Sequence, residues 1–133
     1  MGILIDSSIL IEHERGGLDL GRMLGRFSEG EGFLSAITAS ELLHGVHRAQ
    51  DPARQARRMA SVEALLAAFP ILPVDVAVAR AHAYLWAHLK SAGTLIGPHD
   101  MWIGATCLAH GHAIVTSNVR EFSRIPGLEV HSA

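Results

Sequence analysis

The chain has 133 residues, a length that suits one domain and is short for two. Hydrophobic residues make up 49% and charged residues 18%, which excludes a disordered chain and a fibrous repeat. Its 11 basic and 13 acidic residues leave a formal net charge of −2, which excludes a generic nucleic-acid binder. The single cysteine, Cys107, excludes an internal disulfide and is typical of a reducing compartment. We therefore expect one domain over residues 1–133, located in the cytoplasm.

No targeting or membrane-spanning segment is expected. Asp6 follows only three consecutive apolar residues, so the start of the chain lacks the apolar core of a signal peptide. Residues 101–119 contain no Asp, Glu, Lys or Arg, but His110 and His112 interrupt this stretch and polar residues close it. We therefore expect no membrane contact.

Short apolar runs alternate with helical patterns in the first half of the chain. Residues 3–5 form an apolar run that predicts a buried strand, and a helix is expected after it, up to the Gly16–Gly17 pair. The second expected helix, at 18–27, has its apolar side chains on one face. A strand at 32–35 follows it, and two further helices come after that strand. In chain order, the expected elements are a strand at 3–5, helices at 7–14 and 18–27, a strand at 32–35, and helices at 38–48 and 53–69.

Proline and glycine divide the second half of the chain. Pro70 and Pro73 enclose a short strand, and Gly97 and Pro98 precede a nearly all-apolar helix that we expect to be buried. The elements expected here are a strand at 71–72, helices at 75–90 and 99–109, and strands at 112–116 and 128–130. We expect the helix at 75–90 to bury Val76, Ala79, Ala83 and Trp86. This alternation predicts an α/β fold with a mostly parallel central sheet flanked by helices.

Three acidic residues stand at equivalent places in this pattern. Asp6 ends the first strand, Glu41 lies near the start of the helix after the second strand, and Asp100 opens the buried helix. The carboxyl ends of parallel strands and the following helix N-termini meet at one edge of a sheet, where such folds bind ligands. Converging carboxylates repel one another unless a cation lies between them, and their oxygen atoms favour Mg²⁺ or Mn²⁺.

Each acid also has a purely structural explanation. Thr38 and Glu41 have the spacing of a capping box, in which Thr38 caps the helix and Glu41 bonds back to the amide of Thr38. Asp100 lies in a first helical turn, where negative charge is favourable. Asp6 can cap the helix that follows it, which is the role we assign to Asp75 in its own helix. Taken singly, each acid fits a cap better than a metal ligand, and only their joint placement favours a metal site.

Four segments of the chain form a set of motifs. In chain order they are ILIDSS at 3–8, SAITASELLHG at 35–45, GPHDMWIGA at 97–105 and VTSNVREF at 115–122. Together they resemble the four motifs of the PIN-domain ribonuclease toxins of the VapC family. Each motif alone is weak, but four in the family's order, over nearly the whole chain, make a highly specific resemblance.

The resemblance implies a PIN-like domain and an endoribonuclease that uses Mg²⁺ or Mn²⁺ to cut structured RNA. The residues that it implies are Asp6, Glu41, Asp100, Asn118 and Glu121 as catalytic groups, Asp6 and Asp100 as metal ligands, and Ser7 and Thr116 as supporting hydroxyls. Asn118 stands where some members have Asp, which leaves the number of metal ions open. The implied partners are the RNA substrate, a VapB-like antitoxin that blocks the acidic site, and a second copy of the chain in a homodimer.

Phosphodiester hydrolysis requires chemistry that these residue types supply. A metal held by carboxylates activates water and neutralises charge on the phosphate, and Glu41 is placed to orient or deprotonate that water. Attack by water, rather than by the 2′-hydroxyl of the RNA, leaves a 5′-phosphate and a 3′-hydroxyl. Two alternatives remain at this stage: a non-catalytic RNA-binding or scaffold module, and a metal-dependent phosphatase. The phosphatase usually needs a second Asp two residues after the first, where this chain has Ser8.

Arginines crowd into one stretch of the chain. The four are Arg48, Arg54, Arg57 and Arg58. A solvated helix face explains them as well as an RNA-binding or antitoxin-binding surface does. Among the histidines, only His99 is expected near the acidic site, because it precedes Asp100.

Overall fold

The fold is built on a five-stranded sheet in which every pairing is parallel. The computed structural model describes residues 2–27 and 31–133, so residues 1 and 28–30 of the expected domain lie outside the described residues. The strands are β1 (Ile3–Ile5), β2 (Gly32–Ser35), β3 (Ile71–Leu72), β4 (Ala113–Val115) and β5 (Val130–His131). Their order across the sheet is β3-β2-β1-β4-β5, with β1 paired to β2 and β4. The expected parallel α/β architecture is confirmed.

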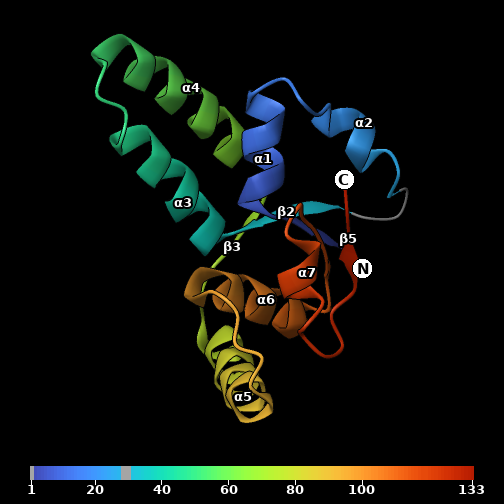
Figure 1. Cartoon of the computed structure of the whole chain (residues 1–133). Coiled ribbons are helices and arrows are strands. Elements are labelled where there is room, and N and C mark those ends of the chain that lie inside the picture. Colours follow the sequence, from blue (N-terminus) through green and yellow to red (C-terminus); the bar gives the residue numbers. More distant parts are fainter. Residues whose placement is uncertain (1, 28–30) are drawn as a thin grey trace.

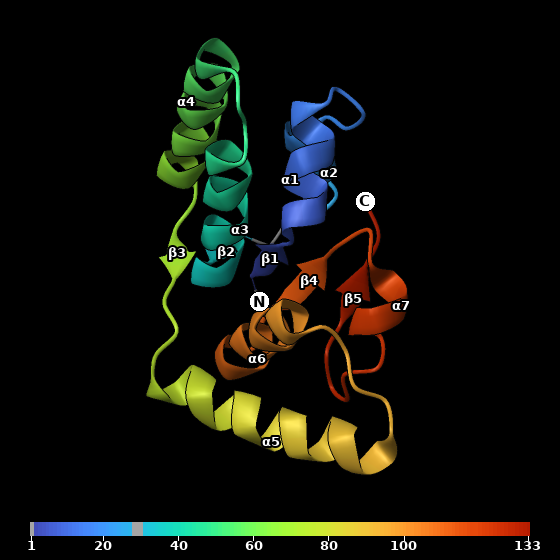
Figure 2. The same cartoon turned by 60° about the vertical axis from the view of Figure 1, so that its left-hand side comes forward.

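Helices cover both faces of the sheet (Figure 1). They are α1 (Ser7–Glu14), α2 (Leu20–Leu24), α3 (Ala36–His47), α4 (Pro52–Ala68), α5 (Val76–Ala92), α6 (Pro98–His110) and α7 (Val119–Phe122). Helices α1 to α4 lie on one side of the sheet, and α5 and α6 lie on the other (Figure 2). No helix in the described part of the chain has the length and apolar character needed to cross a membrane.

The alternation of side chains along β1 divides the core into two. Ile3 and Ile5 point into the cluster formed with α1 to α4, whereas Leu4 points into the cluster formed with α5, α6 and α7. Val115 and Ile114 of β4 divide in the same way, and all five side chains are buried. Both faces of the central strands are therefore covered, which explains why these strands are apolar runs rather than alternating patterns.

Helix α5 begins and ends as the sequence indicates, but its buried face was predicted wrongly. Asp75 caps it through a 3.0 Å hydrogen bond from the Val78 amide, and Gly93 ends it with φ of 71°. All four residues of the expected buried face are exposed, and Val76 and Trp86 expose 66% and 52% of their surface. The buried residues are instead Val78, Leu85 and Leu89.

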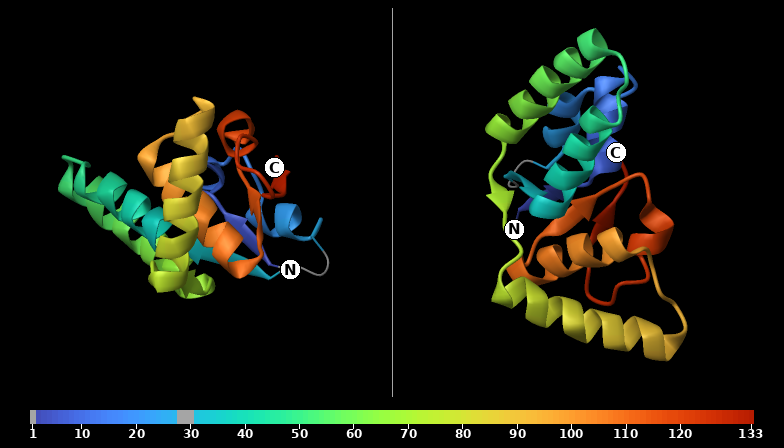
Figure 3. Two further views of the ribbon diagram at one scale, coloured as in Figure 1. Left: turned by 90° about the horizontal axis from the view of Figure 1, so that it is seen from below. Right: turned by 90° about the vertical axis from the view of Figure 1, so that its left-hand side faces the viewer.

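The position of α5 explains this error. It lies along α6 at the outside of the molecule, as the right-hand view of Figure 3 shows, so only one narrow side of it meets the core. Apolar residues occupy both that side and the opposite side. A periodicity of hydrophobic residues cannot decide between two such faces.

Helix α3 begins two residues before the expected start and has a different cap. Ser35, at the end of β2, accepts a 2.9 Å hydrogen bond from the Thr38 amide and donates one of 3.1 Å to the Thr38 hydroxyl. The expected capping box of Thr38 and Glu41 is therefore wrong. Because the helix follows β2 directly, Glu41 falls in its second turn and is available for contacts with other elements.

Smaller differences concern element ends. The expected helix at 18–27 is shorter: α2 begins at Leu20, because Asp19 caps it through the Arg22 amide at 3.0 Å, and it ends at Leu24, before Gly25. The last strand lies at Val130–His131 rather than 128–130, where it pairs with Ile114 and Val115 of β4.

Candidate functional site

Asp6 is the central acid of the site and lies directly after β1. Its carboxylate is buried, with 4% of the residue exposed. Thr116, directly after β4, donates a 2.7 Å hydrogen bond to Oδ2, and Ser8 donates another of 2.8 Å to the same atom. Among the described residues, Oδ1 receives no side-chain hydrogen bond. Asp6 stands at the N-cap position of α1 without a side-chain capping bond, so the expected cap role of its carboxylate is wrong.

Glu41 connects three helices at the same edge of the sheet. Its Oε1 accepts a 3.1 Å hydrogen bond from Ser7 of α1, and its Oε2 lies 3.5 Å from Nδ1 of His99 in α6. The His99 side chain is 64% exposed, so its ring lies at the open side of the site. Ser7 therefore holds Glu41, whereas the hydroxyl that holds Asp6 from α1 belongs to Ser8.

Asn118 links the two remaining acids. Its Nδ2 donates a 2.9 Å hydrogen bond to Oδ2 of Asp100 and a 2.8 Å bond to Oε2 of Glu121. Its own amide donates to the Thr116 hydroxyl at 2.9 Å. A continuous chain of hydrogen bonds thus runs from Asp6 through Thr116 and Asn118 to Asp100 and Glu121.

The structure thus brings all the expected site residues together from the ends of β1 and β4, the start of α7, and helices α1, α3 and α6. The residue that sequence reasoning missed is Ser8, whose hydroxyl contacts Asp6 and accepts a 3.1 Å hydrogen bond from the Ser117 amide. Its position two residues after Asp6 was a usable signal, because short polar side chains at that spacing commonly bond locally.

The site holds an excess of negative charge. The pKa of Asp100 is raised to about 7, mainly by burial and also by the hydrogen bond with Glu121 and the charges of Asp6, Glu121 and Glu41. The pKa of Glu121 is lowered by its hydrogen bonds with Asp100 and Asn118. Without a cation, Asp100 therefore keeps its proton to higher pH than Glu121 does.

The donor set fits a hard divalent cation. Asp6 and Asp100 lie close enough for their charges to interact, and both present carboxylate oxygens. In the described residues, 2–27 and 31–133, no group of three or more His, Cys, Asp or Glu side chains is arranged so that it could hold a metal ion. Mg²⁺ is usually bound through one or two carboxylates while it keeps several waters, so two ligands suffice.

The excess charge predicts a pH-dependent effect of Asp100→Asn. The native pKa of about 7 lies above the value of about 3.9 for an unfolded Asp, so the native state retains this proton between those values. The free energy of unfolding of the wild type therefore falls as pH rises from about 4 to about 7. The Asp100→Asn variant does not show this fall, because Asn has no proton to lose. In the presence of a chelator, we expect the variant to melt a few degrees above the wild type at about pH 8 and the difference to vanish at about pH 4. Thermal melts across this range measure it, and a pH-independent difference would contradict it.

Comparison with known proteins identifies the family. The family model described as "PIN domain" matches residues 3–128. Ribonuclease VapC1 of Rickettsia felis is 36% identical over 98% of this chain and 95% of that protein. The tRNA(fMet)-specific endonuclease VapC of Salmonella typhimurium is 34% identical over 73% of this chain and 71% of that protein. The crystal structure of DNA-bound VapBC from Salmonella typhimurium contains a chain that superposes with a TM-score of 0.88 at 27% identity, covering 99% of this chain and 98% of that one. The protein belongs to the PIN-domain family, among its VapC ribonucleases.

Proposed function

We propose that this chain is a metal-dependent endoribonuclease and the toxin of a VapBC-type toxin–antitoxin pair. The observation that supports it most is the convergence of Asp6, Glu41, Asp100 and Glu121 at the carboxyl edge of β1 and β4. The relatives at 36% and 34% identity are named as a ribonuclease and an endonuclease, which supports hydrolysis of RNA. RNA as substrate and the single cysteine, Cys107, favour a cytoplasmic location.

In the proposed mechanism, Asp6 and Asp100 are the residues that would hold a Mg²⁺ or Mn²⁺ ion. When bound, such an ion supplies an activated water and neutralises charge on the phosphate. Thr116 and Ser8 fix Oδ2 of Asp6, which leaves Oδ1 to face the ligand. Ser7 fixes one oxygen of Glu41, so the other oxygen is available to orient the attacking water or to accept its proton.

Asn118 sets the positions of Asp100 and Glu121 relative to each other. One amide group donates to both carboxylates, so it holds them on either side without adding a third negative charge. A charged side chain here would increase the repulsion that already raises the pKa of Asp100. We propose that Glu121 acts as a positioning group for water on the open side of the site.

The proposed macromolecular partners are a VapB-like antitoxin and structured RNA. The likeness of this chain to a chain of the DNA-bound VapBC structure of Salmonella typhimurium supports a VapB-like partner. An acidic site is blocked most directly by a basic side chain, so we propose that the antitoxin places one against Asp6 and Asp100. The name of the Salmonella typhimurium endonuclease makes tRNA the first substrate to test.

The structure disfavours the phosphatase alternative. That reaction would use a group two residues after Asp6 to transfer protons, but Ser8 is there and its hydroxyl donates to Asp6 itself. A non-catalytic RNA-binding or scaffold module remains the alternative, and RNA cleavage decides between it and the nuclease.

Asp100→Asn tests the catalytic assignment. We expect the wild type to cut tRNA with Mg²⁺ or Mn²⁺ and to leave 5′-phosphate and 3′-hydroxyl ends, and the variant to be slower by about 10²- to 10³-fold. Asp19→Asn is the matched control, because Asp19 caps α2 far from the site and Asn also caps helices. Cleavage by Asp100→Asn at the rate of Asp19→Asn would contradict the assignment.

Metal binding is expected to stabilise the fold. Mn²⁺ or Mg²⁺ relieves the repulsion between Asp6 and Asp100, so each should raise the melting temperature relative to a monovalent salt at equal ionic strength. Asp6→Asn and Asp100→Asn should each reduce this shift, whereas Asp19→Asn should keep it. Equal melting temperatures in the two salts for the wild type would count against a preformed metal site.

We also propose that two copies of the chain associate through the outer side of α5. This outer face is defined by four exposed residues that recur at helical spacing: Val76, Ala79, Ala83 and Trp86. The only charged residues in this 17-residue helix are Arg80 and Lys90. An exposed helix with so little charge is typical of a surface that is covered in an assembly.

Light scattering on a size-exclusion column tests the homodimer. We expect a dimer for the wild type and a monomer for the double variant Ala83→Glu and Trp86→Glu, because two buried unpaired charges oppose association. Tyr84→Glu with His88→Glu is the matched control on another exposed side of α5, and it should remain a dimer. A dimer that survives the outer-face variant would contradict this interface.

A further inference from the structure

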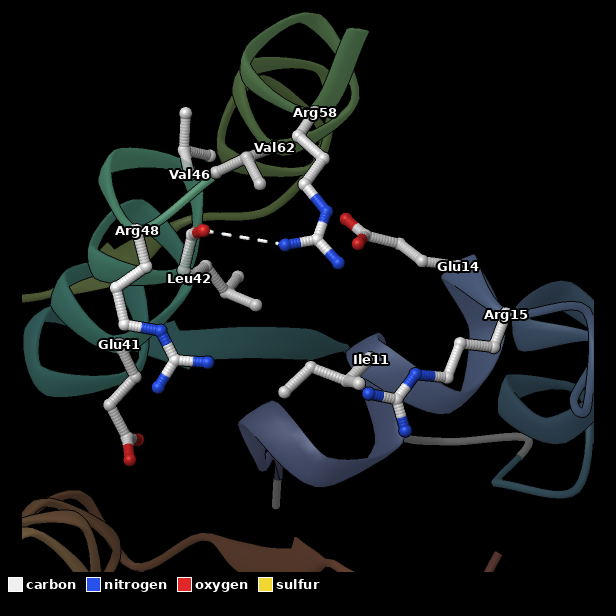
Figure 4. Close-up of a pocket in the computed structure, with 10 residues that line it drawn as sticks. Ile11, Glu14, Arg15, Glu41, Leu42, Val46, Arg48, Arg58 and Val62 are labelled. Carbon is white, nitrogen blue, oxygen red and sulfur yellow. Dashed lines mark hydrogen bonds between the residues drawn. The ribbon is translucent and has the colours of Figure 1, made fainter. Parts of the chain in front are cut away.

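A groove between α1, α3 and α4 lies beside the acidic site (Figure 4). Its floor is apolar and consists of side chains from all three helices: Ile11, Leu42, Val46 and Val62. Its walls include three guanidinium groups, those of Arg15, Arg48 and Arg58, which Figure 4 shows directed toward the open space. Arg15 lies far in sequence from the stretch that contains Arg48 and Arg58, and only the fold brings it to the other two.

The groove is continuous with the acidic site. A neighbouring hollow is lined by Ser7, His44 and His99 and shares with the groove the residues Ile11, Glu41, Gly45 and Arg48. Glu41 is therefore both a wall of the groove and a member of the acidic site. A chain molecule bound at Asp6 and Asp100 has a path past Glu41 into the groove.

The guanidinium groups of the groove are available to bind an anion. In the described part of the chain, Arg15, Arg48 and Arg58 form no ion pair, and Arg58 donates only a long 3.4 Å hydrogen bond to the Gly45 carbonyl. All three residues are exposed. Besides Glu41, the acid in the groove is Glu14, which accepts a 3.4 Å hydrogen bond from Ser61.

Charge decides which molecule the groove suits. The site residues Asp6, Glu41 and Asp100 repel a phosphate backbone, so a substrate of this kind needs compensating positive charge nearby. Guanidinium groups match phosphate oxygens with two parallel hydrogen bonds, which favours Arg for this task. The apolar floor between the three arginines offers a contact surface for the apolar parts of riboses and bases.

We propose that the RNA strand next to the bond to be cut lies in this groove, with its phosphates bound by Arg15, Arg48 and Arg58. The proposal rests on the proposed nuclease function and names the path of the substrate. Of the four arginines that are close in sequence, the proposal assigns only Arg48 and Arg58 to RNA binding. Arg54 lines a neighbouring hollow that shares Arg48 and Arg58 with the groove and also contains Asp51, and neither Arg54 nor Arg57 lines the groove itself, so the proposed path does not include them.

Binding measurements on uncut RNA test the path. All proteins contain Asp100→Asn so that RNA stays intact, and fluorescence anisotropy measures the affinity for a tRNA and for a ten-nucleotide oligouridylate at several salt concentrations. The groove variant replaces Arg15, Arg48 and Arg58 by Gln. We expect it to bind on the order of tenfold or more weakly at low salt, with a slope of log affinity against log salt that is smaller by about two.

The matched control replaces Arg22, Arg26 and Arg57 by Gln, which removes the same charge at exposed positions outside the groove. The path is supported if the control binds RNA nearly as tightly as the protein with Asp100→Asn alone and the groove variant binds more weakly. Equal losses in both variants would overturn it, because they would reflect net charge alone. Unchanged affinity and slope in the groove variant would also overturn it and leave the groove to a protein segment such as the antitoxin.

Cleavage by the chain without Asp100→Asn separates this proposal from the proposed function. If the wild type cuts RNA and the groove variant binds RNA normally, the nuclease stands and the path is wrong. If the wild type fails to cut RNA but binding depends on the three groove arginines, the path stands and the nuclease is wrong.

Discussion

Thr116, directly after β4, donates a 2.7 Å hydrogen bond to the carboxylate of Asp6, which lies directly after β1 and has 4% of its residue exposed. This contact joins residues 110 positions apart and depends on the register in which Ile5 pairs with Val115. A buried carboxylate without hydrogen bonds would be strongly destabilising, so the site requires that register. The rest of the site extends from this bond, because Thr116 also holds the Asn118 amide, and Asn118 holds Asp100 and Glu121.

Charge is the second constraint, and it explains features both within the site and around it. Burial and the neighbouring acids raise the pKa of Asp100, so in the absence of a cation the protein is less stable in the protonation state that ligates metal. The same acids repel an RNA backbone. The site therefore depends on positive charge from two sources, a metal ion at Asp6 and Asp100 and the guanidinium groups of the adjoining groove.

The fold was largely predictable where one physical signal dominated. Buried central strands such as β1 consist of apolar residues on both faces, and Asp75 and Gly93 mark the ends of α5 through capping preferences that act locally. The start of α3 was not predictable, because Ser35 and Thr38 are both good caps and only the end of β2 decides between them. The buried face of α5 was also missed, because Val76 and Val78 are equally apolar, and contact with α6 alone determines which one is covered.

The four motifs, with Asp6, Glu41, Asp100 and Glu121, were identified from the sequence alone, together with the family and the edge of the sheet at which these acids meet. Residue types and spacing suffice for that, because the topology of a parallel sheet brings its strand ends to one side. Only the tertiary structure decided which group holds which acid: Ser8 rather than Ser7 bonds Asp6, and Glu41 contacts Ser7 and His99 instead of capping its own helix. It also brought Arg15 beside Arg48 and Arg58, because contacts between distant segments depend on how the helices pack, which no local pattern encodes.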